Sequence, residues 1–204
     1  MVLVARETAQ KILPDKNCFP FVCDLATADD LQKSLVTRHA SLVTFFGMIP
    51  NFAPQEILPK LAALVRPQDW LLFSANLAPG KNYAAGVKQV LPQYDNALTR
   101  DWLLTFLTDL GVERGDGKLF FEIKDDALNG LKRITANFHF TRAVRIKLEN
   151  ETFEFLGGES IRLFFSYRYT PARVRKILSR QGLQVREEWI SQSGEEGVFL
   201  CRRK

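Results

Sequence analysis

Two apolar stretches, Ser41-Leu-Val-Thr-Phe-Phe-Gly47 and Trp70-Leu-Leu-Phe-Ser-Ala-Asn-Leu77, decide the fold of this chain. Continuous apolar runs of this length are typical of strands that are buried on both faces, as in a parallel sheet. Residues 53–65 between them have a helical pattern, with Pro54 at the expected helix start. A strand, a helix and a second strand in this order predict a right-handed parallel crossover. We therefore expect an α/β fold whose ligands bind beyond the carboxyl ends of the strands.

A third apolar run, Phe19-Pro-Phe-Val-Cys23, lies upstream and ends at Asp24. We interpret this run as a short buried strand of the same sheet. Helical patterns are expected at residues 6–13 and 27–35. The loops that follow the three apolar runs would then lie at the carboxyl edge of the sheet, where functional residues are expected.

The pattern changes after residue 82. Two helical segments, residues 84–90 and 98–110, come first, and Thr99 is the expected N-cap of the second. The strand-like segments that follow are residues 119–123, 132–140, 144–148, 152–155 and 160–169. Some of these alternate apolar and polar residues, as an antiparallel sheet with one exposed face does. We expect an inserted α+β subdomain at residues 84–168 that binds the substrate.

A basic helix at residues 171–180 and two strands, 183–190 and 197–202, follow the insertion. A helix followed by an antiparallel strand pair resembles the end of a class I methyltransferase sheet. We therefore assign residues 1–83 and 169–204 to one Rossmann-like core, which we expect to be incomplete at its N-terminal strand.

The composition is that of an ordinary globular chain, with 46% apolar and 25% charged residues among 204. No apolar run approaches the ~18–20 residues that span a bilayer, and the N-terminus lacks the pattern of a signal peptide. The three cysteines lack the spacing of a metal knuckle, and two histidines are too few for a His-built metal site. We expect a cytoplasmic protein with no bound metal and no membrane partner.

The net charge is +5, and the cationic excess lies late in the chain. Two interpretations are open. These side chains form a solvated face, or they form a patch for nucleic acid or an acidic substrate. No nucleic-acid-binding signature accompanies them, so we favour the solvated face.

Five groups of residues occur in a specific order. They are Val22-Cys-Asp-Leu25; Phe45-Phe-Gly-Met-Ile-Pro-Asn-Phe52; Leu71-Leu-Phe-Ser-Ala-Asn-Leu77; Gln93-Tyr-Asp-Asn96; and Gly158-Glu-Ser-Ile161 with Ser166-Tyr-Arg-Tyr169. Together they resemble the histidine-specific methyltransferase family, which makes trimethylhistidine on the way to ergothioneine. The resemblance covers nearly the whole chain. It implies a class I methyltransferase sheet, S-adenosylmethionine as cofactor and a small-molecule substrate.

The resemblance also implies roles for individual residues. The cofactor-binding positions are Asp24, Leu25, Phe46 and Gly47, and the substrate-binding positions are Asn51, Phe52, Tyr94, Phe164 and Ser166. Asp24 would accept a hydrogen bond from the adenine amino group, and the Asn51 amide would grip a carboxylate or amine. The alternatives stay open: a turn Asp, a loop Asn, a packing Tyr and a Ser on the polar face of a strand. No catalytic residue is assigned, because methyl transfer needs alignment more than acid–base help.

Four departures from the family pattern bear on function. No glycine-rich loop precedes residue 2, and Leu3 stands where the family has the acid that holds the ribose. Pro50 replaces a glycine, and Phe164 replaces the glutamate that pairs with the substrate ammonium. The last change predicts a substrate other than histidine. An aromatic lining that includes Phe165 suits a bulkier or less cationic molecule.

Three functional hypotheses follow. The first is a small-molecule methyltransferase. The second is a non-catalytic truncated chain or pseudoenzyme, completed by a second copy or a complementing chain, because a missing strand would expose a sheet edge. The third is a basic nucleic-acid-binding module, whose affinity would fall steeply with salt.

Overall fold

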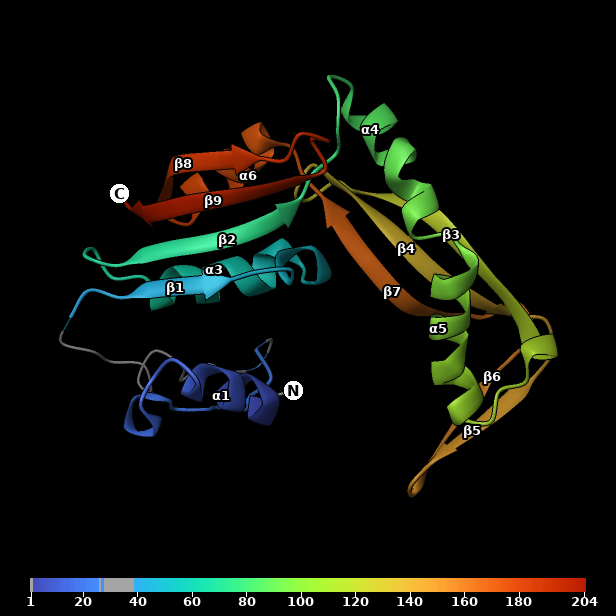
Figure 1. Ribbon diagram of the computed structural model, residues 1–204. Coiled ribbons are helices and arrows are strands. Elements are labelled where there is room, and N and C mark those ends of the chain that lie inside the picture. The colour runs from blue at the N-terminus through green and yellow to red at the C-terminus, as the bar shows by residue number, and fades with distance from the viewer. Residues whose placement is uncertain (1, 26, 28–38) are drawn as a thin grey trace. The chain divides into compact units, whose positions relative to one another are not determined.

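The computed structural model describes residues 2–25, 27 and 39–204 (Figure 1). The chain divides into two compact units, Met1–Val36 and Thr37–Lys204. The first unit contains α1 (Val2–Gln10) and a short 3-10 helix, η1 (Asp15–Asn17). The predicted helix at residues 6–13 is thus confirmed in its first half, but it begins and ends earlier. Pro14 follows its last turn and disfavours helical geometry in the residue before it.

The predicted buried strand at residues 19–23 is wrong. These residues form no regular structure, and Phe19 and Val22 are 86% and 79% exposed. A strand needs a hydrogen-bonded neighbour, and the described residues of this unit include no other strand. The helix predicted at residues 27–35 lies outside the described residues, apart from Thr27.

The larger unit contains a four-stranded sheet in the order β1-β2-β9-β8. Its strands are β1 (Leu42–Phe45), β2 (Trp70–Asn76), β8 (Leu183–Ile190) and β9 (Glu196–Arg203). The strands β1 and β2 are parallel, and α3 (Pro54–Leu64) connects them. The last strand, β9, is antiparallel to both of its neighbours. The parallel crossover, with Pro54 at its helix start, and the terminal hairpin after α6 (Pro171–Arg180) are therefore confirmed.

Burial of both faces of β1 was expected and is wrong. Leu42 is 57% exposed and Phe46 is 49% exposed, whereas Phe45 is buried. The reason is position, because β1 lies at one end of the sheet within Thr37–Lys204. In β2, which has a neighbour on each side, Leu71 and Phe73 are buried.

A second sheet has the antiparallel order β3-β4-β7. Its strands are β3 (Gly117–Asp126), β4 (Leu131–Phe140) and β7 (Ser160–Arg168), and β5 (Val144–Leu148) pairs with β6 (Glu151–Phe155) as a hairpin. All five predicted strands are confirmed. The helices α4 (Tyr83–Val90) and α5 (Ala97–Asp109) precede them. Thr99 is not the N-cap of α5: Asn96 is, because its side chain accepts from the Thr99 N–H at 3.0 Å.

The two sheets meet where β2 and β7 end. Leu77 and Tyr169 form a parallel bridge, and the Tyr169 N–H donates to the Asn76 carbonyl at 2.9 Å. In Figure 1 the strand β7 reaches the carboxyl end of β2 and leads away into the second sheet. The core of the second sheet includes Leu107 and Phe138, packed between α5 and the strands. This junction brings the end of β7 to the edge where ligands are expected.

A buried carboxylate fixes the start of the parallel pair. Asp69 is 1% exposed and accepts from the Ser41 N–H at 2.8 Å, just before β1. It also accepts from the backbone N–H of Arg66 at 2.9 Å and from its Nε at 2.7 Å. The hydrogen bonds from Arg66 hold the pKa of the Asp69 carboxyl well below its usual range. One side chain therefore ties the turn before β2 to the entry of β1.

We expect Asp69→Ala to lower the free energy of unfolding by on the order of 2–3 kcal/mol, because two buried backbone donors lose their acceptor. Denaturant unfolding at neutral pH measures this change. Asp109, exposed at the end of α5, serves as the control, and Asp109→Ala should change stability by less than about 0.5 kcal/mol.

The same contact predicts a pH dependence. Because the folded pKa of Asp69 is depressed, its contribution is complete above the unfolded pKa of about 4 and is lost as pH falls below that value. Asp69→Asn should flatten the stability curve in this acid range. An unchanged acid slope in this variant would contradict the assignment.

Candidate functional site

A polar cavity of about 350 Å³ lies at the carboxyl end of β2. Asn76 is the last residue of β2 and faces Glu196, the first residue of β9. The lining side chains are Asn76, Gln93, Tyr94, Arg168, Ser191, Ser193, Glu195 and Glu196. They come from β2, β7, the 3-10 helix η3 (Leu91–Gln93) and the turn after it, the β8–β9 loop, and the start of β9. The cavity thus occupies the edge of the sheet where the sequence predicts ligand binding.

Arg168 forms the base of the cavity and is 4% exposed. Its Nη1 donates to the carbonyl oxygens of Leu77 at 3.0 Å and Glu195 at 3.3 Å, and its Nη2 donates to the Tyr94 hydroxyl at 2.6 Å. Its Nε is buried without an acceptor among the described residues. All three acceptors are uncharged oxygens, so this buried cation has no anionic counterpart within residues 39–204. Such a charge favours an anionic or strongly accepting ligand group nearby.

The hydroxyl of Tyr94 acts as an obligate donor. It accepts from Arg168 and, at 3.4 Å, from the Asn76 Nδ2, and these two bonds use both of its lone pairs. Its own proton is then left for Ser166 Oγ, which lies 3.2 Å away. Asn76 Nδ2 also donates to Ser166 Oγ at 3.4 Å. The Tyr94 hydroxyl is therefore fully used within the cluster, and the unpartnered Arg168 Nε is the donor that suits an acceptor such as a carboxylate.

The period of β7 places the members of this cluster together. Phe164, Ser166 and Arg168 alternate along the strand and so share one face of the sheet. Between Ala136 and Asn137 of β4 the register shifts, and Leu163 is the extra residue of a β-bulge in β7.

A close helix approach brings Tyr94 to the same place. Gly86 in α4 lies against the chain just after β2, where a Cβ would come 2.2 Å from the Pro79 carbonyl oxygen. Only glycine allows α4 this position. The helix leads into η3, and the Tyr94 N–H donates to the Leu91 carbonyl at 3.0 Å. The turn after η3 thus presents Tyr94 to the end of β7.

Three of the substrate-binding residues expected from the sequence come together in the structure. The rings of Tyr94 and Phe164 lie 5.6 Å apart, and Ser166 contacts Tyr94 through its hydroxyl. Ser166 is 1% exposed, so here it orients Tyr94 rather than facing the cavity. Tyr94 is half-buried and lines the cavity.

The loop after β1 carries the next group of expected residues. Gly47 has a φ of +71°, and its N–H donates to Ser74 Oγ at 2.8 Å. Asn51 ends the 3-10 helix η2 (Ile49–Asn51), which lies beside β2 and β7. Asn51 is exposed, and Phe52 is half-buried with its ring 6.3 Å from that of Phe45. This loop therefore lies near the polar cluster, although Asn51 and Phe52 do not line the polar cavity.

The other expected cofactor-binding residues, Asp24 and Leu25, belong to the unit Met1–Val36. Asp24 is exposed, and its carbonyl accepts from the Thr27 N–H at 3.2 Å in a turn. Leu25 is half-buried. Their role in cofactor binding stays a prediction.

Sequence reasoning missed Asn76, Arg168 and Glu195. Asn76 and Arg168 stand inside the quoted segments, at positions where the family has an acid and a lysine. A signal was available for Arg168, since a charged residue within the aromatic run from Phe164 to Tyr169 is rarely buried without a purpose. Glu195 gave no signal, because it lies in a polar loop whose partners are distant in sequence.

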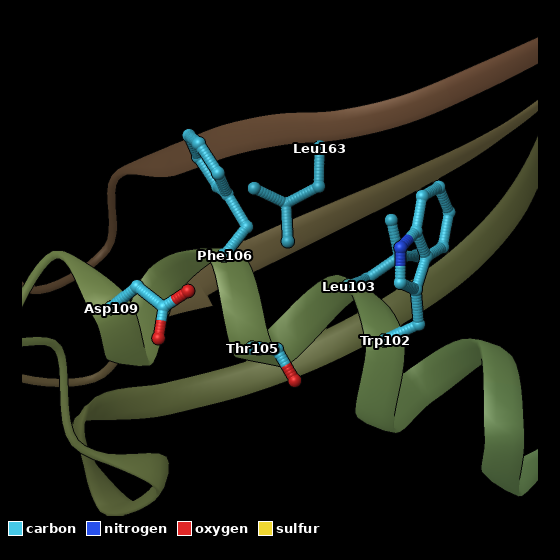
Figure 2. A pocket seen from close by; sticks show the side chains of 6 residues that line it. All are labelled: Trp102, Leu103, Thr105, Phe106, Asp109 and Leu163. Carbon is cyan, nitrogen blue, oxygen red and sulfur yellow. The ribbon is translucent and has the colours of Figure 1, made fainter. Parts of the chain in front are cut away.

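A second cavity, of about 420 Å³, lies between α5 and β7 (Figure 2). It is lined by Trp102, Leu103, Thr105, Phe106, Asp109 and Leu163. Trp102 and Phe106 are 66% and 56% exposed. The lining contributes only Thr105 and Asp109 as polar side chains, too few to fix the orientation of a polar small molecule. We therefore take the polar cavity as the candidate site.

Most of the cationic side chains late in the sequence form hydrogen bonds or ion pairs with other groups of the protein. Arg203 donates to the Ala62 carbonyl at 2.8 Å, Arg202 to the Pro67 carbonyl at 2.9 Å, and Arg175 forms an ion pair with Glu188. These contacts tie the C-terminal strands to the rest of the unit. Part of this charge therefore serves contacts within the protein, which neither the solvated face nor the nucleic-acid patch predicted.

A family model described as histidine-specific methyltransferase, SAM-dependent, matches residues 4–203. This chain belongs to that family. It is a SAM-dependent methyltransferase, and S-adenosylmethionine is its cofactor. A comparison with curated proteins found no match.

Several solved structures are similar at low identity. A SAM-dependent methyltransferase from Clostridium acetobutylicum is 11% identical, with 97% of this chain and 70% of that chain covered and a TM-score of 0.45. The CcbJ methyltransferase from Streptomyces caelestis is 14% identical, with 100% and 75% covered and a TM-score of 0.44. Magnesium protoporphyrin IX methyltransferase from Synechocystis is 16% identical, with 100% and 60% covered and a TM-score of 0.41.

The loop after β1, where the sequence predicts cofactor contacts, has apolar side chains that are open to solvent. Phe46 and Met48, beside Gly47, are 49% and 39% exposed at the carboxyl end of β1. No atom lies within 4 Å of the position that a Cβ would take on Gly47, so this loop has an open apolar surface.

In the described part of the chain, no helix is long and apolar enough to cross a membrane. The same residues hold no cluster of three metal-ligating side chains.

A matched pair of Tyr→Phe variants tests the hydrogen-bonded cluster. We expect Tyr94→Phe to destabilise the protein by about 1–2 kcal/mol, because a buried donor of Arg168 loses its acceptor. Tyr169 is buried, and its hydroxyl has no hydrogen-bond partner among the described residues. Tyr169→Phe should therefore be neutral or stabilising.

Urea unfolding of both variants measures the difference. Equal destabilisation by the two substitutions would show that loss of any tyrosine hydroxyl in this region has the same effect. That outcome would contradict the role assigned to Arg168 and Tyr94.

Proposed function

We propose that this protein transfers a methyl group from S-adenosylmethionine to a small molecule bound at the carboxyl edge of the β1-β2-β9-β8 sheet. The acceptor is an amino acid or a derivative of one, other than histidine. The supporting observation is the cluster of Arg168, Tyr94 and Asn76, which lines a cavity of small-molecule size and in which the Arg168 Nε has no acceptor among the described residues. This cluster suits the carboxylate of such a substrate.

When bound, the cofactor supplies a methyl group that is already activated by its sulfonium. The protein then has to align the nucleophile with the methyl carbon and the sulfur, and to exclude water. The open surface at Phe46, Gly47 and Met48 supports placement of the adenosyl group after β1. Asp24 would accept from the adenine amino group, as its counterpart in the family does.

The substrate would be bound by residues of β7, η2 and the turn after η3. Arg168 would donate to a substrate carboxylate from its unpartnered Nε, and Tyr94, held by Arg168 and Ser166, would line the pocket beside it. Asn51 would add an amide contact from η2, which lies beside β7. Phe164 offers a ring face against Tyr94 instead of a negative charge. The replacement of the family's glutamate by Phe164 supports a substrate other than histidine.

One feature supports an alternative assembly. Within Thr37–Lys204, β1 ends the sheet, and its Leu42 is 57% exposed. A free edge with apolar side chains favours pairing with another strand. A second copy or a complementing chain would supply that strand. Sedimentation equilibrium tests this alternative through the mass of the particle in solution.

Cofactor binding provides the direct test of function. Titration calorimetry with S-adenosylhomocysteine should show saturable binding at one site per chain. Asp24→Asn should weaken this binding by about tenfold, since an amide cannot match a carboxylate as an acceptor for the adenine amino group. Asp101→Asn, an exposed change on α5, is the control for lost charge.

Absence of heat with S-adenosylhomocysteine would favour the non-catalytic hypothesis. Binding of a DNA duplex that weakens steeply between low and high salt, without any effect of S-adenosylhomocysteine, would favour the nucleic-acid hypothesis.

A further inference from the structure

We infer that Glu195, on the β8–β9 loop, selects substrates that carry a protonated amine. The inference rests on the proposed function, because it takes the polar cavity as the place where the methyl acceptor binds. No pattern in the sequence marks Glu195, and its position follows from the packing of the loop against β2 and β7.

The loop that carries Glu195 is fixed by its backbone. The Leu77 N–H donates to the Glu195 carbonyl at 2.6 Å, and Arg168 Nη1 donates to the same oxygen at 3.3 Å. Gly194 has a φ of +71°, which permits the tight turn before Glu195. The side chain takes no part in these bonds. It is therefore free to serve the cavity, while its backbone holds the loop.

The Glu195 carboxylate lies at the wall of the cavity and is oriented by a neutral neighbour. Gln93 Nε2 donates to its Oε2 at 3.0 Å. In the part of the chain that the structure describes, its Oε1 accepts no hydrogen bond and no lysine or arginine forms an ion pair with it. A half-buried carboxylate with one amide partner retains acceptor capacity for a cation.

The charges in the cavity are separated rather than paired. Arg168 is buried at the base with an unpartnered Nε, and its guanidinium binds the Glu195 carbonyl instead of the Glu195 carboxylate. The lining combines one buried positive charge, Arg168, with two carboxylates, Glu195 and Glu196, and this set complements a molecule with an acceptor group and an ammonium group. The hydroxyls of Ser191 and Ser193 lie in the same lining, where they accept from the Glu196 and Glu195 N–H groups at 3.2 and 3.3 Å and so hold the loop in place.

Glu195 supplies a carboxylate to the cavity from a position outside β7. The strand β7 has a phenylalanine at residue 164, which carries no charge. Glu195 reaches the same cavity from the β8–β9 loop and accepts from Gln93, the residue before Tyr94. An amine-bearing substrate is thus compatible with Phe164, provided that its ammonium group points toward the loop.

Three probes of similar shape distinguish recognition of the ammonium group from recognition of the carboxylate. They are L-phenylalanine, which has both groups, phenethylamine, which lacks the carboxylate, and hydrocinnamate, which lacks the amine. Their dissociation constants are measured by titration calorimetry in saturating S-adenosylhomocysteine, for the wild type and for Glu195→Gln. We expect Glu195→Gln to weaken L-phenylalanine and phenethylamine by about tenfold or more, and to leave hydrocinnamate within about twofold.

Glu187→Gln is the matched control, because Glu187 is an exposed residue of β8 outside the cavity and its change removes the same charge. Unchanged amine affinity in Glu195→Gln, an equal loss for all three probes, or no binding of phenethylamine to the wild type would overturn the inference. Failure of the proposed function has a different signature, the absence of S-adenosylhomocysteine binding in the first titration.

Discussion

Burying the guanidinium of Arg168 imposes a condition on the rest of the site. A buried cation must keep its donors occupied, and here the acceptors are the Leu77 carbonyl, the Glu195 carbonyl and the Tyr94 hydroxyl. These three groups belong to the end of β2, the β8–β9 loop and the turn after η3. None of these segments can move away without leaving a buried N–H unpaired. Electrostatics therefore couples segments that are distant in sequence.

The coupling extends to the backbone of Arg168. The Tyr83 hydroxyl donates to the Arg168 carbonyl at 2.7 Å and accepts from the Lys132 N–H at 2.6 Å. The first residue of α4 is thus bonded to β7 and β4 together. A donor cluster held in this way keeps its direction before a ligand arrives, and preorganised donors lose little entropy on binding. This suits a reaction in which alignment supplies most of the rate.

The sequence allowed the regular elements to be predicted because their apolar patterns are local. The parallel pair, α5 and the antiparallel strands all follow from periodicity and turn residues. The segment at residues 19–23 failed because a strand also depends on a neighbour, which no local pattern specifies. Tyr94 and Ser166 could be proposed from a family resemblance. Arg168 and Glu195 could not, because their roles arise only when three loops converge.

The β-bulge at Leu163 has a consequence for which side chains the strand presents to Tyr94. Side chains of a strand alternate between faces, so one inserted residue reverses the parity of everything after it. With the insertion, Ile161 shares its side of β7 with Phe164, Ser166 and Arg168. Deleting the one extra residue of the bulge would place Phe165 and Tyr167 on that side of β7 and the Arg168 guanidinium on the opposite side. The one unpaired residue of the bulge thus decides whether the polar or the aromatic side chains of β7 face the pocket.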